Sequence, residues 1–186
     1  FLLAQWNVVG YAPSRAVWHF RQGVAHAEAG ALDAAIEHYR QAAADWRTED
    51  GADHPEIYNN LGRLLARQGK TDQAVDAYRA GLEIAPENSV LHNNLGYEYY
   101  KLGRLDEAIA HYDAAVAHNP QWTLPHMNLG NALLEHGRPE AAAEAYRAVL
   151  DLEPDNAFAH YNLGRAHERQ ERPDEAIKRY HRALEL

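Results

Sequence analysis

Residues 94–120 carry the stretch NLGYEYYKLGRLDEAIAHYDAAVAHNP, which decides the fold because its pattern recurs along the chain. The tripeptide Asn-Leu-Gly returns every 34 residues, with its glycine at Gly62, Gly96, Gly130 and Gly164. An alanine lies twelve residues after each of these glycines, a tyrosine lies sixteen after, and a proline follows twenty-four after the first three. A more divergent fifth copy fits the same positions at Gly23, Ala35 and Tyr39. The shared register predicts a repeat protein.

Each copy predicts two helices, and in four of the five copies a second glycine separates them, at Gly30, Gly69, Gly103 and Gly137. At about 100° per residue, the first-helix glycine shares one stripe with the leucine before it and with residues four before and three after. In the second copy this stripe holds Tyr58, Leu61, Gly62 and Leu65, and we expect it to be buried. Glycine and alanine allow close backbone approach, and the tyrosine of the second helix fills the space beside them. One hairpin cannot bury its own apolar face, so the copies must stack as a solenoid.

The offsets of glycine, alanine, tyrosine and proline resemble those of the tetratricopeptide repeat family. The resemblance covers Ala16 to Leu186. It implies an all-α fold, a right-handed α-solenoid of about five helix-turn-helix repeats with a concave groove lined by the first helices. The expected repeats span residues 16–46, 55–88, 89–122, 123–156 and 157–186. In four copies a histidine stands where the family often has a large aromatic residue, at His19, His92, His126 and His160.

An insertion separates the first two copies, because Gly23 and Gly62 are 39 residues apart. We place the surplus in a loop over residues 47–54, after a helix that ends near Trp46. Residues 51–55, followed by Asn60-Leu61, resemble a junction of kinesin-light-chain-type repeats. A tolerated surface insertion is the simpler interpretation.

Residues 1–15 are expected to form part of a preceding repeat or an N-terminal helix, since Pro13 has the offset of the later prolines. A membrane anchor is the rival interpretation, but residues 1–12 are too short and too polar to span a bilayer, so we expect no direct membrane insertion by this fragment. No polar capping helix follows residue 186 in this sequence. We therefore expect a piece of a longer protein, or exposed ends that pair with a partner or form a homo-oligomer.

The predicted groove carries a recurring carboxamide, because Asn60, Asn94, Asn128 and Asn162 fall once per repeat on the face opposite the buried stripe. A carboxamide both donates and accepts, which suits the backbone of an extended peptide. The arrangement resembles the asparagine ladder of the O-GlcNAc transferase repeats. The alternative, in which each asparagine bonds to the neighbouring helix, stays equally open.

Basic and aromatic side chains accompany the asparagines, and the expected groove face has six basic and four acidic residues while the whole chain has a net charge of -9. Acidic side chains or a C-terminal carboxylate of a partner would suit such a surface. The two-carboxylate clamp of heat-shock co-chaperone repeats is absent, since Leu124 and Asn128 stand where it requires Lys and Arg. The candidate peptide-binding residues are Asn59, Asn60, Arg63, Arg67, Asn93, Asn94, Tyr97, Tyr100, Lys101, Asn128, Asn131, Tyr161, Asn162, Arg165 and Arg169.

Composition argues against several function classes. The negative charge disfavours nucleic acid, and the absence of cysteine excludes thiol chemistry. The only serines, Ser14 and Ser89, lack a G-x-S-x-G setting, and the twelve histidines form no H-E-x-x-H motif. We therefore expect no enzyme, no cofactor and no metal site.

The most economical function is a scaffold or adaptor that binds an extended protein segment in the groove. Two alternatives remain: docking or self-assembly through the repeat ends, and an interaction arm of a larger enzyme or membrane protein. Arginine outnumbers lysine 15 to 3, which is typical of a GC-rich bacterial source, and both cytoplasm and periplasm stay open.

Overall fold

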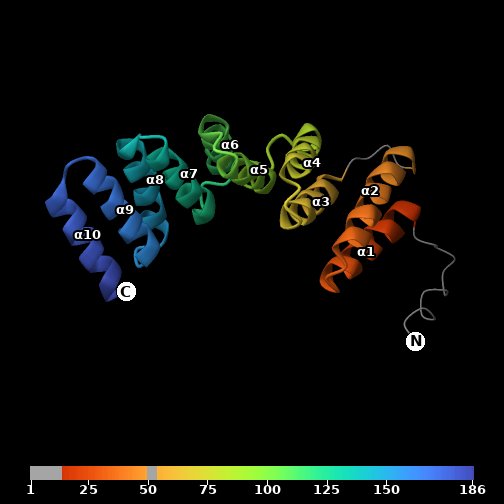
Figure 1. Cartoon of the computed structure of the whole chain (residues 1–186), viewed down its shortest axis with the longest axis horizontal. Helices are drawn as coiled ribbons and strands as arrows, with labels where there is room; N and C mark the ends of the chain where they lie inside the picture. Colours follow the sequence, from red (N-terminus) through yellow and green to blue (C-terminus); the bar gives the residue numbers. More distant parts are fainter. Residues whose placement is uncertain (1–13, 50–53) are drawn as a thin grey trace. The chain divides into compact units, whose positions relative to one another are not determined.

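The computed structural model describes residues 14–49 and 54–186, and within these ranges the chain forms ten α-helices and no strands (Figure 1). The helices divide into two compact units, residues 1–85 and 86–186, which are described separately. The all-α repeat architecture expected from the sequence is confirmed. The expected helix or partial repeat over residues 1–15 lies almost entirely outside the described residues.

The first unit consists of two antiparallel hairpins. Helices α1 (Arg15–Glu28) and α2 (Leu32–Glu49) form one hairpin, and α3 (Pro55–Arg67) and α4 (Thr71–Ile84) form the other, with α2 packed against α3. The Ser14 side chain caps α1 by accepting a hydrogen bond from the backbone N–H of Val17 at 3.3 Å. Pro55 opens α3, where a missing N–H costs no helical hydrogen bond.

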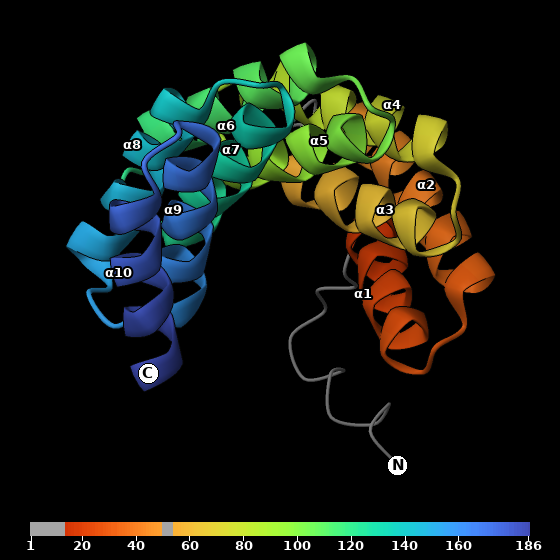
Figure 2. The same ribbon diagram turned by 60° about the vertical axis from the view of Figure 1, so that its left-hand side comes forward.

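The second unit stacks three hairpins. They pair α5 (Ser89–Lys101) with α6 (Leu105–His118), α7 (Thr123–Glu135) with α8 (Pro139–Leu152), and α9 (Ala157–Arg169) with α10 (Pro173–Glu185). Consecutive first helices α5, α7 and α9 lie side by side within this unit (Figure 2). Asn88 and Asn156 cap α5 and α9 with their side-chain oxygens.

The predicted buried stripe forms the core in both units. Tyr58, Leu61 and Leu65 are at most 8% exposed, and Leu95 and Tyr99 are at most 1% exposed. Each first-helix glycine faces the ring of the tyrosine sixteen residues later, so close that a Cβ at any of the five positions would lie within 3 Å of a ring carbon. The glycines therefore set how closely the two helices of a hairpin approach.

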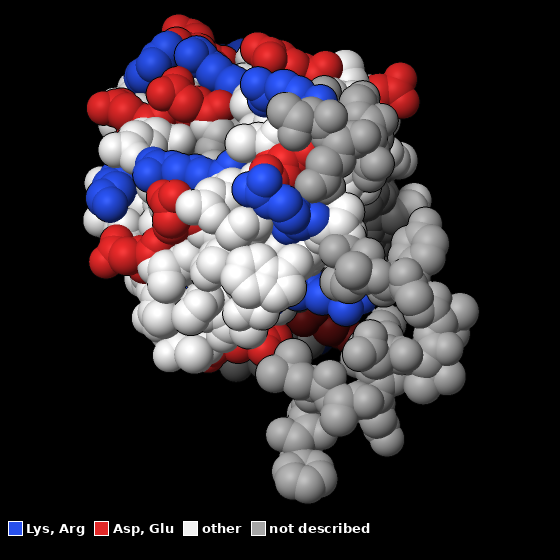
Figure 3. Space-filling view, turned by 90° about the vertical axis from the view of Figure 1, so that its right-hand side faces the viewer, with Lys and Arg blue, Asp and Glu red and all other residues white. Residues whose placement is uncertain are grey.

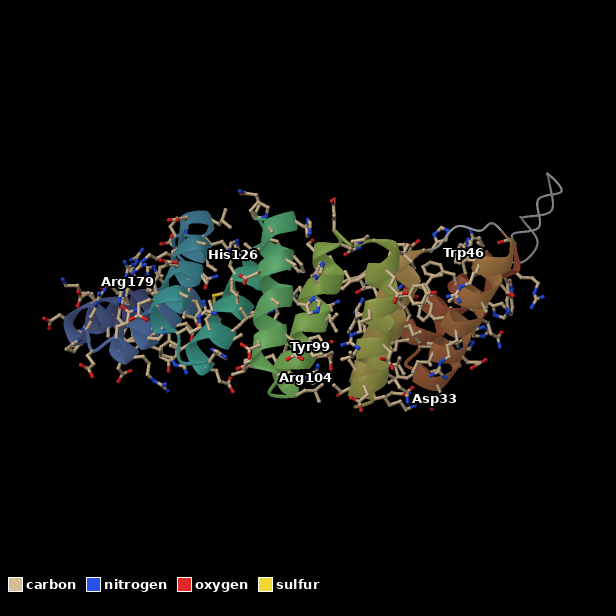
Figure 4. All side chains as sticks on the ribbon, turned by 90° about the horizontal axis from the view of Figure 1, so that it is seen from above. Asp33, Trp46, Tyr99, Arg104, His126 and Arg179 are labelled. Carbon is tan, nitrogen blue, oxygen red and sulfur yellow. The ribbon has the colours of Figure 1, made fainter. Side chains whose placement is uncertain are left out.

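The insertion between the first two repeats is shorter than expected, because α2 continues through residues 47–49. The prediction of a loop beginning at residue 47 was therefore wrong. Trp46 is only 8% exposed and packs against the ring of Phe20, with centroids 5.9 Å apart, which extends the apolar stripe of α2 by a further turn. Arg47 then donates from Nη2 to the Tyr58 hydroxyl at 2.9 Å, which ties the end of α2 to α3. Trp46 is labelled on α2 in Figure 4.

Candidate functional site

The first helices of the second unit enclose a polar pocket of about 390 Å³. Its walls come from α5, α7 and α9, at the positions that the helical periodicity places opposite the core. The lining residues are Tyr100, Asn131, Leu134, Glu135, Asn162, Arg165 and Arg169. Five of the seven belong to the set of candidate peptide-binding residues, so the structure brings part of that set together.

The first unit has a pocket of about 330 Å³ between α1 and α3, with one residue from α2. Its lining residues are Val24, Ala27, Glu28, Tyr39, Asn60, Arg63, Leu64 and Arg67. Three of the candidate residues, Asn60, Arg63 and Arg67, meet in this pocket. Both units thus present an asparagine and two arginines of one first helix to a hollow beside the preceding first helix.

The recurring asparagines are half-buried, and each takes part in a hydrogen bond within its own unit. Asn128 donates from Nδ2 to Oδ1 of Asn93 at 2.9 Å, and Asn162 accepts at Oδ1 from Arg165 at 3.1 Å. Asn94 accepts a long hydrogen bond of 3.4 Å from Asn93, and Asn60 is hydrogen-bonded to the Tyr39 side chain. Asn128 on α7 and Asn60 on α3 are therefore hydrogen-bonded to neighbouring helices, α5 and α2, as the alternative to a free carboxamide ladder expects.

One predicted groove residue is not on the surface. Asn93 is 4% exposed, and its side chain bridges Asn94 of its own helix and Asn128 of the next first helix. The expectation that Asn93 lies on an exposed groove face was wrong, because its side chain is buried. The cause is its position at the border of the core stripe, where the carboxamide of the following repeat covers it. Asn59, at the same position of the first unit, is half-buried and engaged in interactions within the chain.

Lys101 has an internal partner that sequence reasoning missed. Glu98 is 2% exposed, and Lys101 donates from Nζ to its carboxylate at 2.6 Å. The ammonium also lies 5.6 Å from the centre of the Tyr97 ring. The available signal was that Glu98 stands two residues after a repeat glycine, where Leu64 and Ala132 occupy the equivalent buried positions. The buried Glu98 carboxylate therefore partly neutralises the charge of Lys101.

Two aromatic candidates lie open to solvent. Tyr97 on α5 is 50% exposed and Tyr161 on α9 is 51% exposed. Asn131 on α7 lines the pocket of the second unit and accepts a hydrogen bond from the Tyr146 hydroxyl at 2.8 Å. Both tyrosines can contact apolar or aromatic side chains of a partner at little cost in conformational entropy.

Tyr100 and Glu135 form the polar floor of the pocket in the second unit. The Tyr100 hydroxyl donates to Oε2 of Glu135. This hydrogen bond, then partial burial and the nearby carboxylate charge, raise the pKa of Tyr100 to about 12, so that the phenol stays protonated and keeps its donor on Glu135. The hydrogen bond orients the carboxylate toward α5.

The arginine side chains of the two pockets are exposed, and Arg63, Arg67 and Arg169 make no hydrogen bond or ion pair with the described part of the chain.

On the face shown in Figure 3, basic and acidic side chains are interspersed and leave uncharged areas between them. A surface of this kind lacks the continuous basic patch that a nucleic-acid backbone requires.

Three of the histidines that replace a family aromatic hold the turn before their own helix. His92, His126 and His160 donate from Nε2 to the carbonyl oxygens of Pro86, Pro120 and Pro154, at 2.8, 3.0 and 2.9 Å. His126 is labelled on α7 in Figure 4. Their regular spacing, six residues after a proline, was visible in the sequence. Among residues 14–49 and 54–186, no group of three or more His, Asp or Glu is arranged to hold a metal ion.

Within the described ranges, no helix combines the length and apolarity needed to cross a bilayer. The helices that line the pockets are instead amphipathic, with one face in the core and one in the solvent.

Family models for the tetratricopeptide repeat match the chain over residues 13–87, 77–110 and 127–186, and a TPR repeat model matches residues 96–137. Together these matches run from residue 13 to residue 186. No curated protein sequence matches the chain.

The chain is also similar to solved structures of MamA. MamA 41-end from Desulfovibrio magneticus RS-1 has a TM-score of 0.84 at 21% identity, with 95% of this chain and 97% of that chain covered. A second MamA structure has a TM-score of 0.83 at 22% identity, with 92% and 91% covered. MamA AMB-1 has a TM-score of 0.77 at 25% identity, with 92% and 91% covered. These likenesses agree with the helical-repeat fold.

Proposed function

The chain belongs to the tetratricopeptide repeat family, and on that premise we propose that it binds an extended segment of a partner protein along its first helices. Proteins built from these repeats are protein–protein interaction scaffolds, and this coarser description applies to the chain as a whole. The finer proposal, a peptide in the groove, rests on the side chains of the two pockets.

A single observation carries the proposal: in each unit, an asparagine and two arginines of one first helix line a hollow next to the preceding first helix. A hollow between parallel helices suits an extended backbone, which presents donors and acceptors to both sides. Polar side chains at its edge supply the directional contacts.

The carboxamides keep part of their hydrogen-bonding capacity despite their internal bonds. Asn128 uses Nδ2 toward Asn93, and Asn162 uses Oδ1 toward Arg165. The side-chain oxygen Oδ1 of Asn128 and the side-chain Nδ2 group of Asn162 are therefore available to a ligand. Asn128 can accept a hydrogen bond from a peptide N–H, and Asn162 can donate one to a peptide C=O. Their internal bonds hold both side chains in place before binding, which lowers the entropic cost of association.

The proposal is tested by selecting peptides from a random linear library against the whole chain and mapping them by hydrogen exchange. We expect bound peptides to protect α5, α7 and α9 more than α6, α8 and α10. Asn162→Ala should weaken binding without lowering the melting temperature, because its internal bond is to an exposed arginine of the same helix. Asn119→Ala, at an exposed helix end, is the matched control. Protection confined to the second helices would refute the groove.

Docking through the end of the repeat array is a second candidate function, favoured by an apolar surface on the last hairpin. Phe158 is 77% exposed and Leu184 is 85% exposed, and both border a hollow of about 500 Å³ together with Tyr161 and Tyr180. Exposed apolar side chains gathered at one place are typical of contact surfaces. Mass measured by light scattering as a function of concentration tests it: self-association should be abolished by Phe158→Ser with Leu184→Ser, and an unchanged mass would count against docking at this hairpin.

A further inference from the structure

The two arginine pockets are equivalent, and we propose that each binds a carboxylate, so that the partner of this scaffold is an acidic peptide segment. The inference rests on the proposed groove function and names the chemistry of its ligand. The residues of one pocket correspond to residues of the other that lie three repeats further along the chain.

The correspondence holds position by position. Asn60, Arg63 and Arg67 on α3 have the same spacing as Asn162, Arg165 and Arg169 on α9. Glu28, near the end of α1, has its counterpart in Glu135, near the end of α7. All eight side chains line their respective pockets. Two pockets of the same charged composition indicate a common ligand chemistry.

The arginines of each pocket lie on one helix face because they are four residues apart. All four are exposed, and none forms an ion pair with the part of the chain that the structure describes. Apart from the Nη1 group of Arg165, which donates to Asn162, the donors of the guanidinium groups therefore face solvent or a ligand. A guanidinium presents two parallel N–H groups that match the two oxygens of a carboxylate.

Neighbouring side chains position one arginine of the second unit. Arg165 donates from Nη1 to Oδ1 of Asn162, which holds the guanidinium over the pocket and leaves its other donors for a ligand. The charge of Arg165 acts on Tyr100 and Tyr146, where it opposes the rise in the pKa of each phenol. Arg63 acts in the same way on Tyr39 of the first unit. Each of these arginines thus acts electrostatically on a tyrosine that lines its pocket, Arg165 on Tyr100 and Arg63 on Tyr39.

The charge balance selects a carboxylate over a more highly charged anion. Each pocket has two arginines and one glutamate, a surplus of one positive charge, and Glu135 is turned toward the Tyr100 hydroxyl. One carboxylate neutralises this surplus. The chain as a whole carries a net charge of -9, which at long range disfavours a densely charged polyphosphate more than a peptide with spaced carboxylates.

Neither of the two repeats between those that carry the arginines offers the same site. In residues 123–156 the two arginine positions are occupied by Asn131 and Glu135. In residues 89–122 the cation, Lys101, is bonded to the buried carboxylate of Glu98. Tyr97 replaces the other arginine in this repeat. The arginine pair is therefore a feature of two particular repeats, rather than a general consequence of the repeat pattern.

The test measures fluorescence anisotropy of labelled peptides with the whole chain. The first probe is an extended peptide of alternating alanine and glutamate, acetylated and amidated at its ends. The second replaces every glutamate with glutamine, and the third is the glutamine peptide with a free C-terminal carboxylate. We expect the glutamate probe to bind at least about tenfold more tightly than the capped glutamine probe, because charged hydrogen bonds to arginine are strong.

The variants assign the binding to the pockets. Arg165→Gln with Arg169→Gln, and separately Arg63→Gln with Arg67→Gln, should each weaken the glutamate probe by about tenfold or more. Arg138→Gln with Arg147→Gln removes the same charge from the N-cap and the body of α8, at exposed positions outside the pocket, and should leave binding nearly unchanged. Arg165→Lys with Arg169→Lys retains the charge but loses the paired donors, so it should fall between the two. Circular dichroism confirms that the variants are folded.

The outcomes separate the ligand chemistry from the groove itself. Preferential binding of the third probe over the second, lost in the arginine variants, would support the carboxylate pocket and identify a chain end as its source. Equal binding of the glutamate and capped glutamine probes, unaffected by the arginine variants, would overturn the carboxylate inference. If Asn162→Ala still weakened the same probes in that case, the proposed groove function would stand without the carboxylate pockets. If library-selected peptides did not bind in the groove at all, both the groove function and the carboxylate pockets would be refuted.

Discussion

The ring of Tyr78 lies against Gly62 so closely that a Cβ built on the glycine would be 2.5 Å from Cε1 of the tyrosine. The relationship is repeated at Gly130 and Tyr146, again with 2.5 Å. Tyr78 is 2% exposed and Tyr146 is fully buried, so neither ring can move aside. The absent side chain of the glycine is thus a packing requirement of the hairpin.

Gly62→Ala should destabilise the protein by about 1–2 kcal/mol. Alanine improves helix propensity by up to ~1 kcal/mol, but forcing a methyl group into a packed core costs ~1–3 kcal/mol. The unfolding midpoint in urea, followed by circular dichroism, measures the change. In a Tyr78→Leu background the clash is relieved, so the same substitution should cost less. Equal costs in the two backgrounds would show that the ring is not the obstacle.

Glu171→Gly should stabilise the protein by about 0.5–1 kcal/mol. Glu171 has φ of 58°, at the turn position where the other four hairpins have glycine with φ between 70° and 79°. A left-handed conformation costs an L-residue ~1–2 kcal/mol, and the greater freedom of glycine in the unfolded chain cancels part of the gain. The reciprocal change Gly137→Ala, at a site with nothing within 4 Å, should destabilise by ~1 kcal/mol. Matched thermal melts of the two variants check both signs.

The helices and the core were predictable because a residue pattern that recurs every 34 positions fixes both the period and the buried face. The glycine and the tyrosine that recur sixteen residues apart in every repeat predicted the contact between the two helices of each hairpin. The end of α2 was not predictable from that pattern, since the packing of Trp46 against Phe20 belongs to this repeat alone. Local packing decided the boundary.

The exposed face of the first helices was predicted only in part, because helical periodicity assigns a face but cannot decide whether a residue at its border is buried. Asn93 lies at such a border, and Asn128 of the next repeat covers it. Arg165 and Arg169, near the middle of the face, line the pocket as expected. The role of Glu135 depends on its hydrogen bond to Tyr100. This bond joins two repeats, so the sequence pattern of a single repeat does not predict it.

Glu135→Gln should lower the pKa of Tyr100 from about 12 toward its usual value of 10.0. The hydrogen bond to the carboxylate is the main cause of the shift, and the carboxylate charge adds to it, so both are reduced in the amide. Nuclear magnetic resonance of selectively labelled tyrosine, titrated at high pH, measures the change.

Tyr180 provides the control for this titration. Its pKa is also raised to about 12, but burial is the main cause and the hydrogen bond to Glu168 at 2.9 Å comes second. Glu168→Gln should therefore lower the pKa of Tyr180 by less than Glu135→Gln lowers that of Tyr100. A Tyr100 pKa that stays near 12 in Glu135→Gln would contradict the pocket geometry described above.

Stability should fall as the pH drops from about 7 to about 5, because folding lowers the pKa of two histidines, the half-buried His38 and the buried His167. Burial and the neighbouring rings of His19 and His26 lower the pKa of His38, against a smaller opposite effect of Glu37. His19 lies 3.0 Å from His38 between their Nδ1 atoms, an arrangement that requires one of these nitrogens to be unprotonated. Burial also lowers the pKa of His167, with Arg147 and Arg179 adding to the effect and Gln170 and Glu175 opposing it.

The sign follows from proton binding. A histidine whose folded pKa lies below its unfolded value of 6.5 binds fewer protons in the folded state, so its contribution is complete above the unfolded pKa and is lost as the pH falls through it. His38→Gln should flatten the dependence of the urea midpoint on pH, whereas His181→Gln, at an exposed position, should retain it. Equal slopes for His38→Gln and the unmodified chain would mean that the cluster around His38 does not drive the loss. A midpoint that rises on acidification would contradict the direction of both shifts.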